Sequence, residues 1–285
     1  MLGDSHPERK PEELDELEKI EINLLLEGIY RQYGYDFRNY NYSSIRRRVR
    51  HRIRIEQLPT ISALQEKVLH NPKVMEKLFS DFSINVTEMF RDPLFFLAFR
   101  QHAVPELQKL PFIRIWHAGC STGQEVFSMA ILLHEEGLLS KTRLYGTDIN
   151  EQVLQKAKKG VFPLQKMQQY TKNYMRAGGK RAFSEYYNVI NGSVQFKPFL
   201  SDNMVFAQHN LVTDRSFNEF HVIICRNVMI YFNEALQNHV HRLLYESLCA
   251  NGFLGLGDKE GVVFTTHASC YEEVDRTEKL YRKLP

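Results

Sequence analysis

The chain has 285 residues, of which 43% are hydrophobic and 25% charged, as is ordinary for a globular protein. Its net charge of +3 is too small to imply a nucleic-acid ligand by itself. The four cysteines are widely spaced and form no CxxC pair, which argues against a zinc site or a disulfide framework. Because no apolar run approaches ~20 residues and the polar start is no signal peptide, we expect a cytoplasmic protein without membrane insertion.

The first third of the chain predicts a small all-helical domain. Residues 1–18 are charged and contain proline, so we expect a disordered lead-in there. Between residues 19 and 95 the apolar side chains recur at helical spacing. Two prolines in AVPELQKLPF (103–112) then mark a change of pattern. We therefore place one domain at 19–95 and a second at 96–285.

In the second domain, strands alternate with helices, which predicts a mostly parallel sheet covered by helices on both faces. The expected strands are 112–117, 142–147, 204–208, 220–225 and 252–257, and the expected helices are 123–137, 151–159 and 234–249. The stretch SEYYNVINGSVQFKPFL interrupts this alternation. Its NGS turn signal lies between residues of good strand propensity, which predicts an inserted β-hairpin at about 184–200.

The stretch WHAGCSTGQEVFSMA (116–130) places two glycines between the first strand and the helix that follows. Such a turn lets the backbone approach a bulky group, and the helix N-terminus offers unpaired N–H groups. Asp148, at the end of the next strand, is suited to bind ribose hydroxyls. Since neither a GxGxxG nor a GxxxxGK[ST] motif is present, a nucleoside without a phosphate chain fits better, S-adenosylmethionine being the common one. Glycines kept for packing alone are the alternative.

Five motifs in chain order resemble those of the CheR-type chemotaxis receptor methyltransferases. They are SINVTEMFRD (83–92), WHAGCSTGQE (116–125), the aspartate at 148, the Asn-Leu pair at 210–211, and CRNVMIYF (225–232). The resemblance covers nearly the whole chain after the lead-in. It implies an α/β fold, namely a class I (Rossmann-like) methyltransferase sheet with a β-hairpin insertion, preceded by a small all-α domain. It also implies methyl transfer from S-adenosylmethionine to glutamate side chains of chemoreceptors, with S-adenosylhomocysteine as the product.

The resemblance further implies which residues form the site. The expected cofactor-binding residues are Asn85, Thr87, Arg91, Gly119, Gln124, Glu125, Asp148, Asn210, Leu211, Arg226 and Asn227. Arg91 and Tyr231 are candidates for orienting the incoming carboxylate, although Tyr231 also fits a packed aromatic with its hydroxyl at the surface. Two departures stand out: Gln124 replaces a glutamate, and GDKE (257–260) replaces G-H-S-E. The second departure puts in doubt any role taken over for that loop.

Six arginines lie in IRRRVRHRIR (45–54), which predicts an amphipathic helix. Its apolar residues, Ile45, Val49 and Ile53, form one stripe, and the arginines lie beside it. We expect Arg46, Arg50 and Arg54 to dock on the acidic methylation region of a receptor's cytoplasmic helical bundle, a solvated face being the alternative. Nucleic acid is not expected, because aromatic residues do not interleave with the arginines. No metal is expected either, since His239 and His241 do not share a helix face. We expect a monomer.

Three other functions stay open. The chain could methylate a non-chemotaxis receptor array, or serve as a non-catalytic adaptor that binds the cofactor. An adaptor would bind S-adenosylhomocysteine tightly without forming a methyl ester. A nucleic-acid methyltransferase would instead bind RNA or DNA with strong salt dependence.

Overall fold

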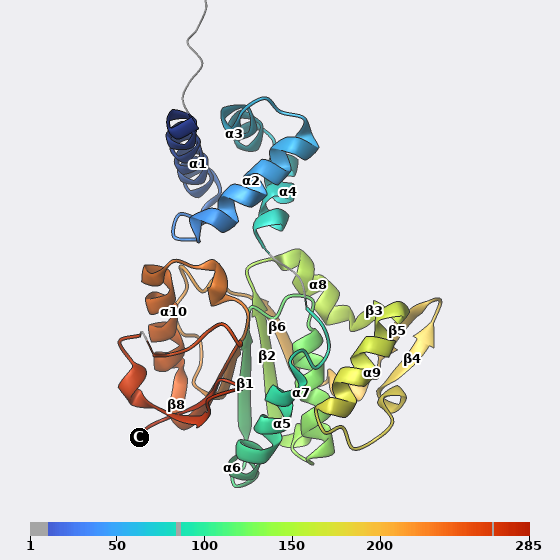
Figure 1. The fold of residues 1–285 in the computed structure, drawn as a ribbon. Helices are drawn as coiled ribbons and strands as arrows, with labels where there is room; N and C mark the ends of the chain where they lie inside the picture. Colours follow the sequence, from blue (N-terminus) through green and yellow to red (C-terminus); the bar gives the residue numbers. More distant parts are fainter. Residues whose placement is uncertain (1–10, 84–86, 264) are drawn as a thin grey trace, which may run out of the picture. The chain divides into compact units, whose positions relative to one another are not determined.

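The computed structural model describes residues 11–83, 87–263 and 265–285, and the chain divides between residues 84 and 85 into two compact units (Figure 1). The N-terminal unit is helical, and the second, which we call the sheet unit, contains all the strands that the structure describes. No helix in the described ranges is long and apolar enough to cross a membrane.

Over residues 11–83, the N-terminal unit contains four helices: α1 (Pro11–Tyr33), α2 (Tyr42–Glu56), α3 (Ile61–His70) and α4 (Pro72–Phe82). Asn41 and Thr60 cap α2 and α3 by accepting backbone N–H bonds. The prediction of a disordered lead-in is wrong for residues 11–18, which form the first turns of α1, while residues 1–10 lie outside the described ranges. Proline is favoured at the first helical position, and Glu12 and Glu13 complement the positive end of the helix dipole.

The predicted domain boundary at residue 95 is also wrong, because the sheet unit begins about ten residues earlier. Phe90, Phe95, Phe96 and Phe99 are fully buried in the same core as the strands. Three of them lie on helix α5 (Pro93–His102), which is followed by the short α6 (Val104–Gln108). Helix α5 packs against α7 of the sheet unit. Its helical pattern alone had suggested that its first residues belong to the N-terminal domain.

The sheet unit is built on a seven-stranded sheet of order β6-β2-β1-β7-β8-β10-β9. The strands are β1 (Ile113–Ala118), β2 (Thr142–Asp148), β6 (Met204–Gln208), β7 (Phe220–Cys225), β8 (Leu248–Leu256), β9 (Tyr271–Asp275) and β10 (Leu280–Lys283). The first five strands in this order are parallel, whereas β10 is antiparallel to both of its neighbours. Helices α7 (Gln124–Glu135) and α8 (Glu151–Lys159) contact β2, and α10 (Glu234–Ser247) contacts β8. The predicted α/β methyltransferase fold is confirmed.

The insertion is larger than the predicted hairpin. Strands β4 (Tyr187–Ile190) and β5 (Ser193–Phe196) form the hairpin, and Asn191 and Gly192 both adopt the positive φ that its turn requires. A third strand, β3 (Val161–Pro163), pairs antiparallel with β5. Helix α9 (Met167–Arg176) follows β3 and precedes β4 in the chain, where no helix was expected from the sequence. The insertion therefore begins near residue 161 rather than 184.

Candidate active site

The loop after β1 is tightly packed within the protein. Gly119 has φ 75° and Gly123 has φ 90°, a region that disfavours residues with a side chain. A Cβ on Gly119 would lie 2.5 Å from Val228 Cγ2, and one on Gly123 would lie 2.9 Å from Ala157 Cβ. Packing thus requires both glycines. That these glycines also give room to a cofactor stays a prediction.

Asp148 joins the end of β2 to this loop. Its Oδ2 accepts the Ser121 N–H and its Oδ1 accepts the Asn150 N–H, both at 2.9 Å. The residue is only 9% exposed, and burial raises the pKa of its carboxyl group. A carboxylate has about four acceptor sites on its two oxygens, so acceptor capacity remains beyond these backbone donors. The carboxylate is therefore fixed in place and suited to accept further hydroxyl donors.

Glu125 lies in the first turn of α7 and faces two donors. His117 Nδ1 is 2.9 Å from its Oε1, and Arg226 Nη1 is 3.4 Å from its Oε2. Burial by itself would raise the pKa of Glu125, but the bond with His117 and the charge of Arg226 hold that pKa below its usual value. Its neighbour Gln124, which is buried, accepts a 2.7 Å bond from the Thr122 hydroxyl. The loop and helix start thus present an ionised carboxylate beside a fixed amide.

Arg226, just after β7, binds groups of the protein itself. Its Nη2 donates to Asp92 Oδ2 at 2.7 Å, and its Nη1 lies 3.2 Å from the Arg91 carbonyl oxygen. Its Nε donates to the Leu256 carbonyl at 3.3 Å, and the guanidinium lies over the Phe95 ring. Its side chain is 2% exposed, so these partners offset the cost of burying the charge. Direct contact of Arg226 with the cofactor stays a prediction.

The segment before α5 is sharply kinked around Arg91. Phe90 has φ 49° and Asp92 has φ 53°, which are uncommon values for residues other than glycine. Besides the bonds from Arg226, the Phe90 N–H donates to Ser128 Oγ at 2.8 Å, and Asn173 Nδ2 donates to the Met89 carbonyl at 3.0 Å. Such strain persists only where surrounding contacts enforce it. The contacts thus fix the backbone that carries the half-buried Arg91.

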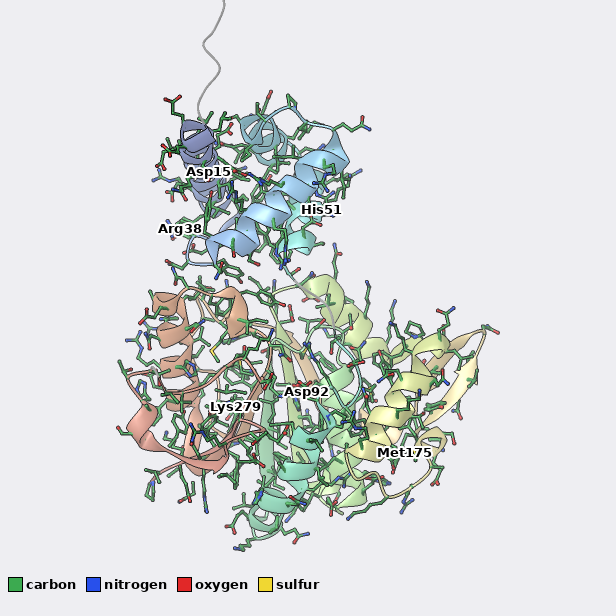
Figure 2. All side chains as sticks on the ribbon, viewed as in Figure 1. Asp15, Arg38, His51, Asp92, Met175 and Lys279 are labelled. Carbon is green, nitrogen blue, oxygen red and sulfur yellow. The ribbon has the colours of Figure 1, made fainter. Side chains whose placement is uncertain are left out.

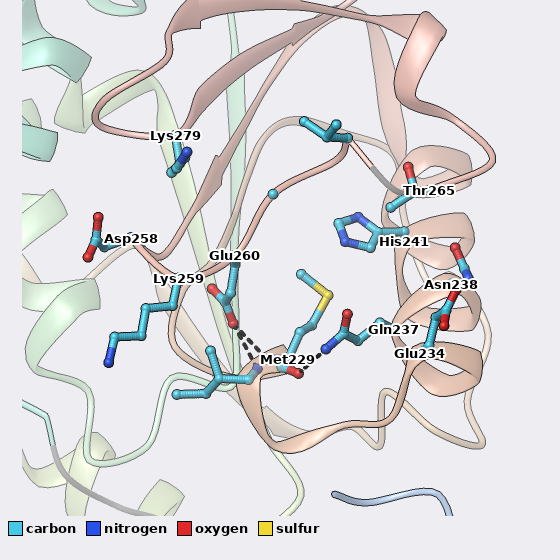
Figure 3. Close-up of a pocket in the computed structure, with 13 residues that line it drawn as sticks. Met229, Glu234, Gln237, Asn238, His241, Asp258, Lys259, Glu260, Thr265 and Lys279 are labelled. Carbon is cyan, nitrogen blue, oxygen red and sulfur yellow. Dashed lines mark hydrogen bonds between the residues drawn. The ribbon is translucent and has the colours of Figure 1, made fainter.

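Glu260 is the principal residue that sequence reasoning missed. Its carboxylate accepts five backbone N–H bonds of 2.7 to 3.3 Å. The donors are Asn227, Val228, Met229, Ile230 and Gly257. Figure 3 shows the bond between Glu260 and Met229. Four of these donors belong to the CRNVMIYF motif, in which Asn227 takes a left-handed conformation at φ 61°. The glutamate that GDKE shares with the family's G-H-S-E was the available signal, so the loop keeps a structural role despite its other changes.

A cavity of about 360 Å³ lies beside this loop (Figure 3). Its lining includes Met229, Gln237, His241, Lys259 and Glu260. Gln237 Nε2 donates to the Met229 carbonyl at 3.0 Å, so helix α10 also supports the motif. The cavity and the motif thus share Met229 and Ile230, and Glu260 of the neighbouring loop also lines the cavity.

The other residues that were predicted to form the site are Asn210, Leu211, Thr87, Tyr231 and Asn85. Asn210 Oδ1 accepts the Val212 N–H at 3.0 Å and so forms a local turn, and Leu211 is buried. Thr87 and Tyr231 are half-buried, the latter in a 3-10 turn after β7, and Asn85 lies outside the described residues. Their roles stay predictions. Within the described ranges, no group of three or more His, Cys, Asp or Glu residues is arranged to hold a metal.

The arginine-rich helix α2 is partly neutralised within the N-terminal unit. Arg46 and Arg50 both bind Glu18 of α1, with closest distances of 2.6 and 2.5 Å, and Arg46 also pairs with Asp15. Burial would raise the pKa of Glu18, but the two arginines lower it further than burial raises it. Arg54 is exposed, as are Arg47 and His51 at positions seven and three residues earlier; His51 is labelled in Figure 2. No ion pair of Arg47 or Arg54 is found in the described part of the chain.

Two family models match the chain. The model described as "CheR methyltransferase, SAM binding domain" matches residues 85–279, and "CheR methyltransferase, all-alpha domain" matches residues 20–83. Together they cover both units of the structure.

Several known proteins are similar over most of their length. A Pseudomonas putida protein provisionally named methyltransferase Cher3 is 50% identical over 93% of this chain and 97% of its own. The chemotaxis protein methyltransferase of Listeria monocytogenes is 24% identical over 82% of this chain and 87% of its own. That of Salmonella typhimurium is 28% identical over 67% and 65%. A solved structure of a methyltransferase from Geobacter sulfurreducens in complex with S-adenosyl-L-homocysteine is more distant. It is 13% identical, with a TM-score of 0.31, over 56% of this chain and 46% of its own.

Proposed function

Because this chain belongs to the CheR methyltransferase family, we propose that it is a protein-glutamate O-methyltransferase that acts on chemoreceptors. It is a methyltransferase that uses S-adenosylmethionine, and S-adenosylhomocysteine is the product. The observation that carries the proposal is the pair of fixed carboxylates, Glu125 and Asp148, at the carboxyl ends of β1 and β2. In open α/β sheets, ligands bind at this edge.

The donor set fits the cofactor. S-adenosylmethionine supplies a methyl group on a positively charged sulfur, and its methionine end carries an ammonium group. Glu125, whose pKa is held low, supplies the negative charge that these cations require, and its side chain is 19% exposed. Asp148 accepts backbone N–H groups on both oxygens and retains acceptor capacity for the ribose hydroxyls. We assign Gln124, Asn210, Leu211 and Asn227 to the rest of the pocket.

The chain's own residues have to position the substrate rather than activate it. A glutamate carboxylate has an ordinary pKa of ~4.3, so it is anionic at pH 7 and no general base is required. The O–C bond forms as the C–S bond breaks, and no proton is transferred. Alignment and exclusion of water supply roughly 7–11 kcal/mol in such cases. We assign the alignment of the incoming carboxylate to Arg91, which the kinked segment holds, and to Tyr231.

We place receptor docking on the exposed cations of α2. Arg54 was expected there from the sequence, and Arg47 and His51 extend the same side of the helix. Arg46 and Arg50 are engaged by Glu18, so their charge is largely offset within the N-terminal unit. The acidic methylation region of a receptor's cytoplasmic bundle complements such a surface. The proposal implies a monomeric protein that works in the cytoplasm.

The decisive experiment is transfer of tritiated methyl from S-adenosylmethionine to receptor-containing membranes, followed by alkaline release of volatile methanol. We expect base-labile counts with the wild-type chain and none with Asp148→Ala. If no receptor in a panel gave counts while S-adenosylhomocysteine still bound, the chain would be the non-catalytic adaptor. Counts only on receptors outside chemotaxis would indicate the non-chemotaxis array.

A further inference from the structure

His117 is a fully buried polar side chain to which neither the motif nor the assignment above gives a role. It lies between Trp116 and Ala118, near the carboxyl end of β1. Its Nδ1 is 2.9 Å from Glu125 Oε1, and its Nε2 is buried without a hydrogen-bond partner among the described residues. An imidazole buried with an unpaired nitrogen is costly, so its presence in the core calls for an explanation.

The chemistry of the pair fixes the direction of the bond. An ionised carboxylate only accepts hydrogen bonds, so the proton lies on His117 Nδ1 and points at Glu125. The other donor to Glu125, Arg226 Nη1, is longer at 3.4 Å and is shared with the Arg91 carbonyl. Because hydrogen bonds weaken with distance, His117 is the stronger of the two constraints on this carboxylate.

We propose that His117 is a positioning residue that orients the Glu125 carboxylate toward the ammonium group of the cofactor's methionine end. The inference rests on the proposed function, since it requires Glu125 to contact that end of the molecule. If so, ligands that carry the amino-acid part of the cofactor depend on His117 for their affinity, and ligands that end at the thioether do not.

The test is isothermal titration calorimetry on the full chain with two ligands, S-adenosylhomocysteine and 5′-methylthioadenosine, the second lacking the amino-acid part. His117→Leu fills the space but removes the donor. We expect it to weaken S-adenosylhomocysteine binding about tenfold, the scale of one hydrogen bond to a charged group, and to leave methylthioadenosine binding within about twofold. His117→Asn places an amide N–H close to the Nδ1 position, so we expect it to bind both ligands within about threefold of wild type.

Several outcomes would overturn the inference. They are wild-type affinity of His117→Leu for S-adenosylhomocysteine, an equal loss of both ligands, or a loss in His117→Asn as large as in His117→Leu. If His117→Leu does not fold, His117→Gln replaces it, because its longer side chain carries the amide past the Nδ1 position. Failure of the wild-type chain to bind S-adenosylhomocysteine would instead refute the proposed function itself.

Discussion

Glu260 Oε1 accepts the backbone N–H of Met229 at 2.7 Å, which joins the loop after β8 to the motif after β7. The same carboxylate binds the N–H groups of Asn227 and Gly257 through its other oxygen. Two segments some thirty residues apart in sequence thus share one anion. The conformation of the CRNVMIYF motif therefore depends on Glu260.

Replacing Glu260 by Gln should destabilise the sheet unit and weaken cofactor binding. An amide has one acceptor oxygen in place of two, so at least two buried N–H groups lose their partner at about 1–3 kcal/mol each. We therefore expect the free energy of unfolding to fall by at least about 2 kcal/mol. The measurement is urea denaturation followed by the fluorescence of Trp116, the chain's single tryptophan, which is fully buried in this unit.

The control for this variant is Glu234→Gln, at an exposed residue on the rim of the same cavity. It should unfold close to the wild-type urea concentration, because an exposed glutamate in the first turn of a helix contributes only about 0.3–1 kcal/mol through the helix dipole. The role assigned to Glu260 would be contradicted if the two variants unfolded alike.

The sequence predicted the parallel part of the sheet closely. The expected ranges 151–159, 204–208 and 220–225 are the observed bounds of α8, β6 and β7. Buried parallel strands are short apolar runs, and their boundaries are marked by the helices between them. Strands β9 and β10 were missed, because their mixed polar and apolar residues do not resemble a buried run.

Contacts between distant residues explain the other errors. The first turns of α1 are polar, but Glu18 binds Arg46 and Arg50 of α2, and no local pattern indicates that partnership. In the candidate site, the motifs indicated Asp148, the last residue of β2, and Glu125, in the first turn of α7. The roles of both residues stay predictions. The motifs did not reveal Glu260, whose bonds reach across about thirty residues. Local sequence patterns predict helices and strands, whereas the residues that support a site are determined by tertiary contacts between those helices, strands and loops.

Asp148→Asn should weaken S-adenosylhomocysteine binding by at least tenfold, on the scale of one hydrogen bond to a charged group. The amide keeps one acceptor, but its NH₂ group faces a backbone N–H that the carboxylate now accepts. Calorimetry measures the change, with the exposed Asp202→Asn as the matched control.

The affinity of the wild-type chain for S-adenosylhomocysteine should also depend on pH. Because burial raises the pKa of Asp148, this affinity should begin to fall on acidification at a higher pH than it would with an ordinary aspartate, whose pKa is ~3.9. An equal acid dependence in Asp148→Asn would contradict this assignment.

Glu135 should make the sheet unit's stability depend on pH. Its side chain is fully buried and accepts bonds from the Tyr186 hydroxyl at 2.8 Å and the Lys180 N–H at 3.0 Å, besides pairing with Arg100. Burial would raise its pKa, but these partners, together with the Tyr174 hydroxyl, lower it further. A carboxyl group with a depressed folded-state pKa stabilises the fold above its unfolded pKa of ~4.3, and this contribution is lost as the pH falls through the folded pKa.

The matching variant is Glu135→Gln. At pH 7 it should lose about 3 kcal/mol of unfolding free energy, because Arg100 is left partly unpaired in the core. The gap to wild type should narrow as the pH falls below ~4.3. Urea titrations of Trp116 fluorescence at several pH values measure both effects, with the exposed Glu246→Gln as the control. A gap that stayed constant down to the acid limit of folding would refute the assignment.

The exposed arginines of α2, Arg47 and Arg54, should affect receptor docking, whereas Arg50, which binds Glu18, should affect stability. Arg47→Glu and Arg54→Glu reverse exposed charges that have no ion pair in the described ranges, so we expect a several-fold lower kcat/KM for receptor methylation with unchanged affinity for S-adenosylhomocysteine. The effect should shrink at high salt, because exposed charges are screened there.

Arg50→Glu should instead lower the stability of the N-terminal unit, since it places a like charge against Glu18. Lys73→Glu, at an exposed cation on α4, is the control for charge reversal alone. If it slowed methylation as much as the α2 variants, net charge rather than this helix face would guide the receptor.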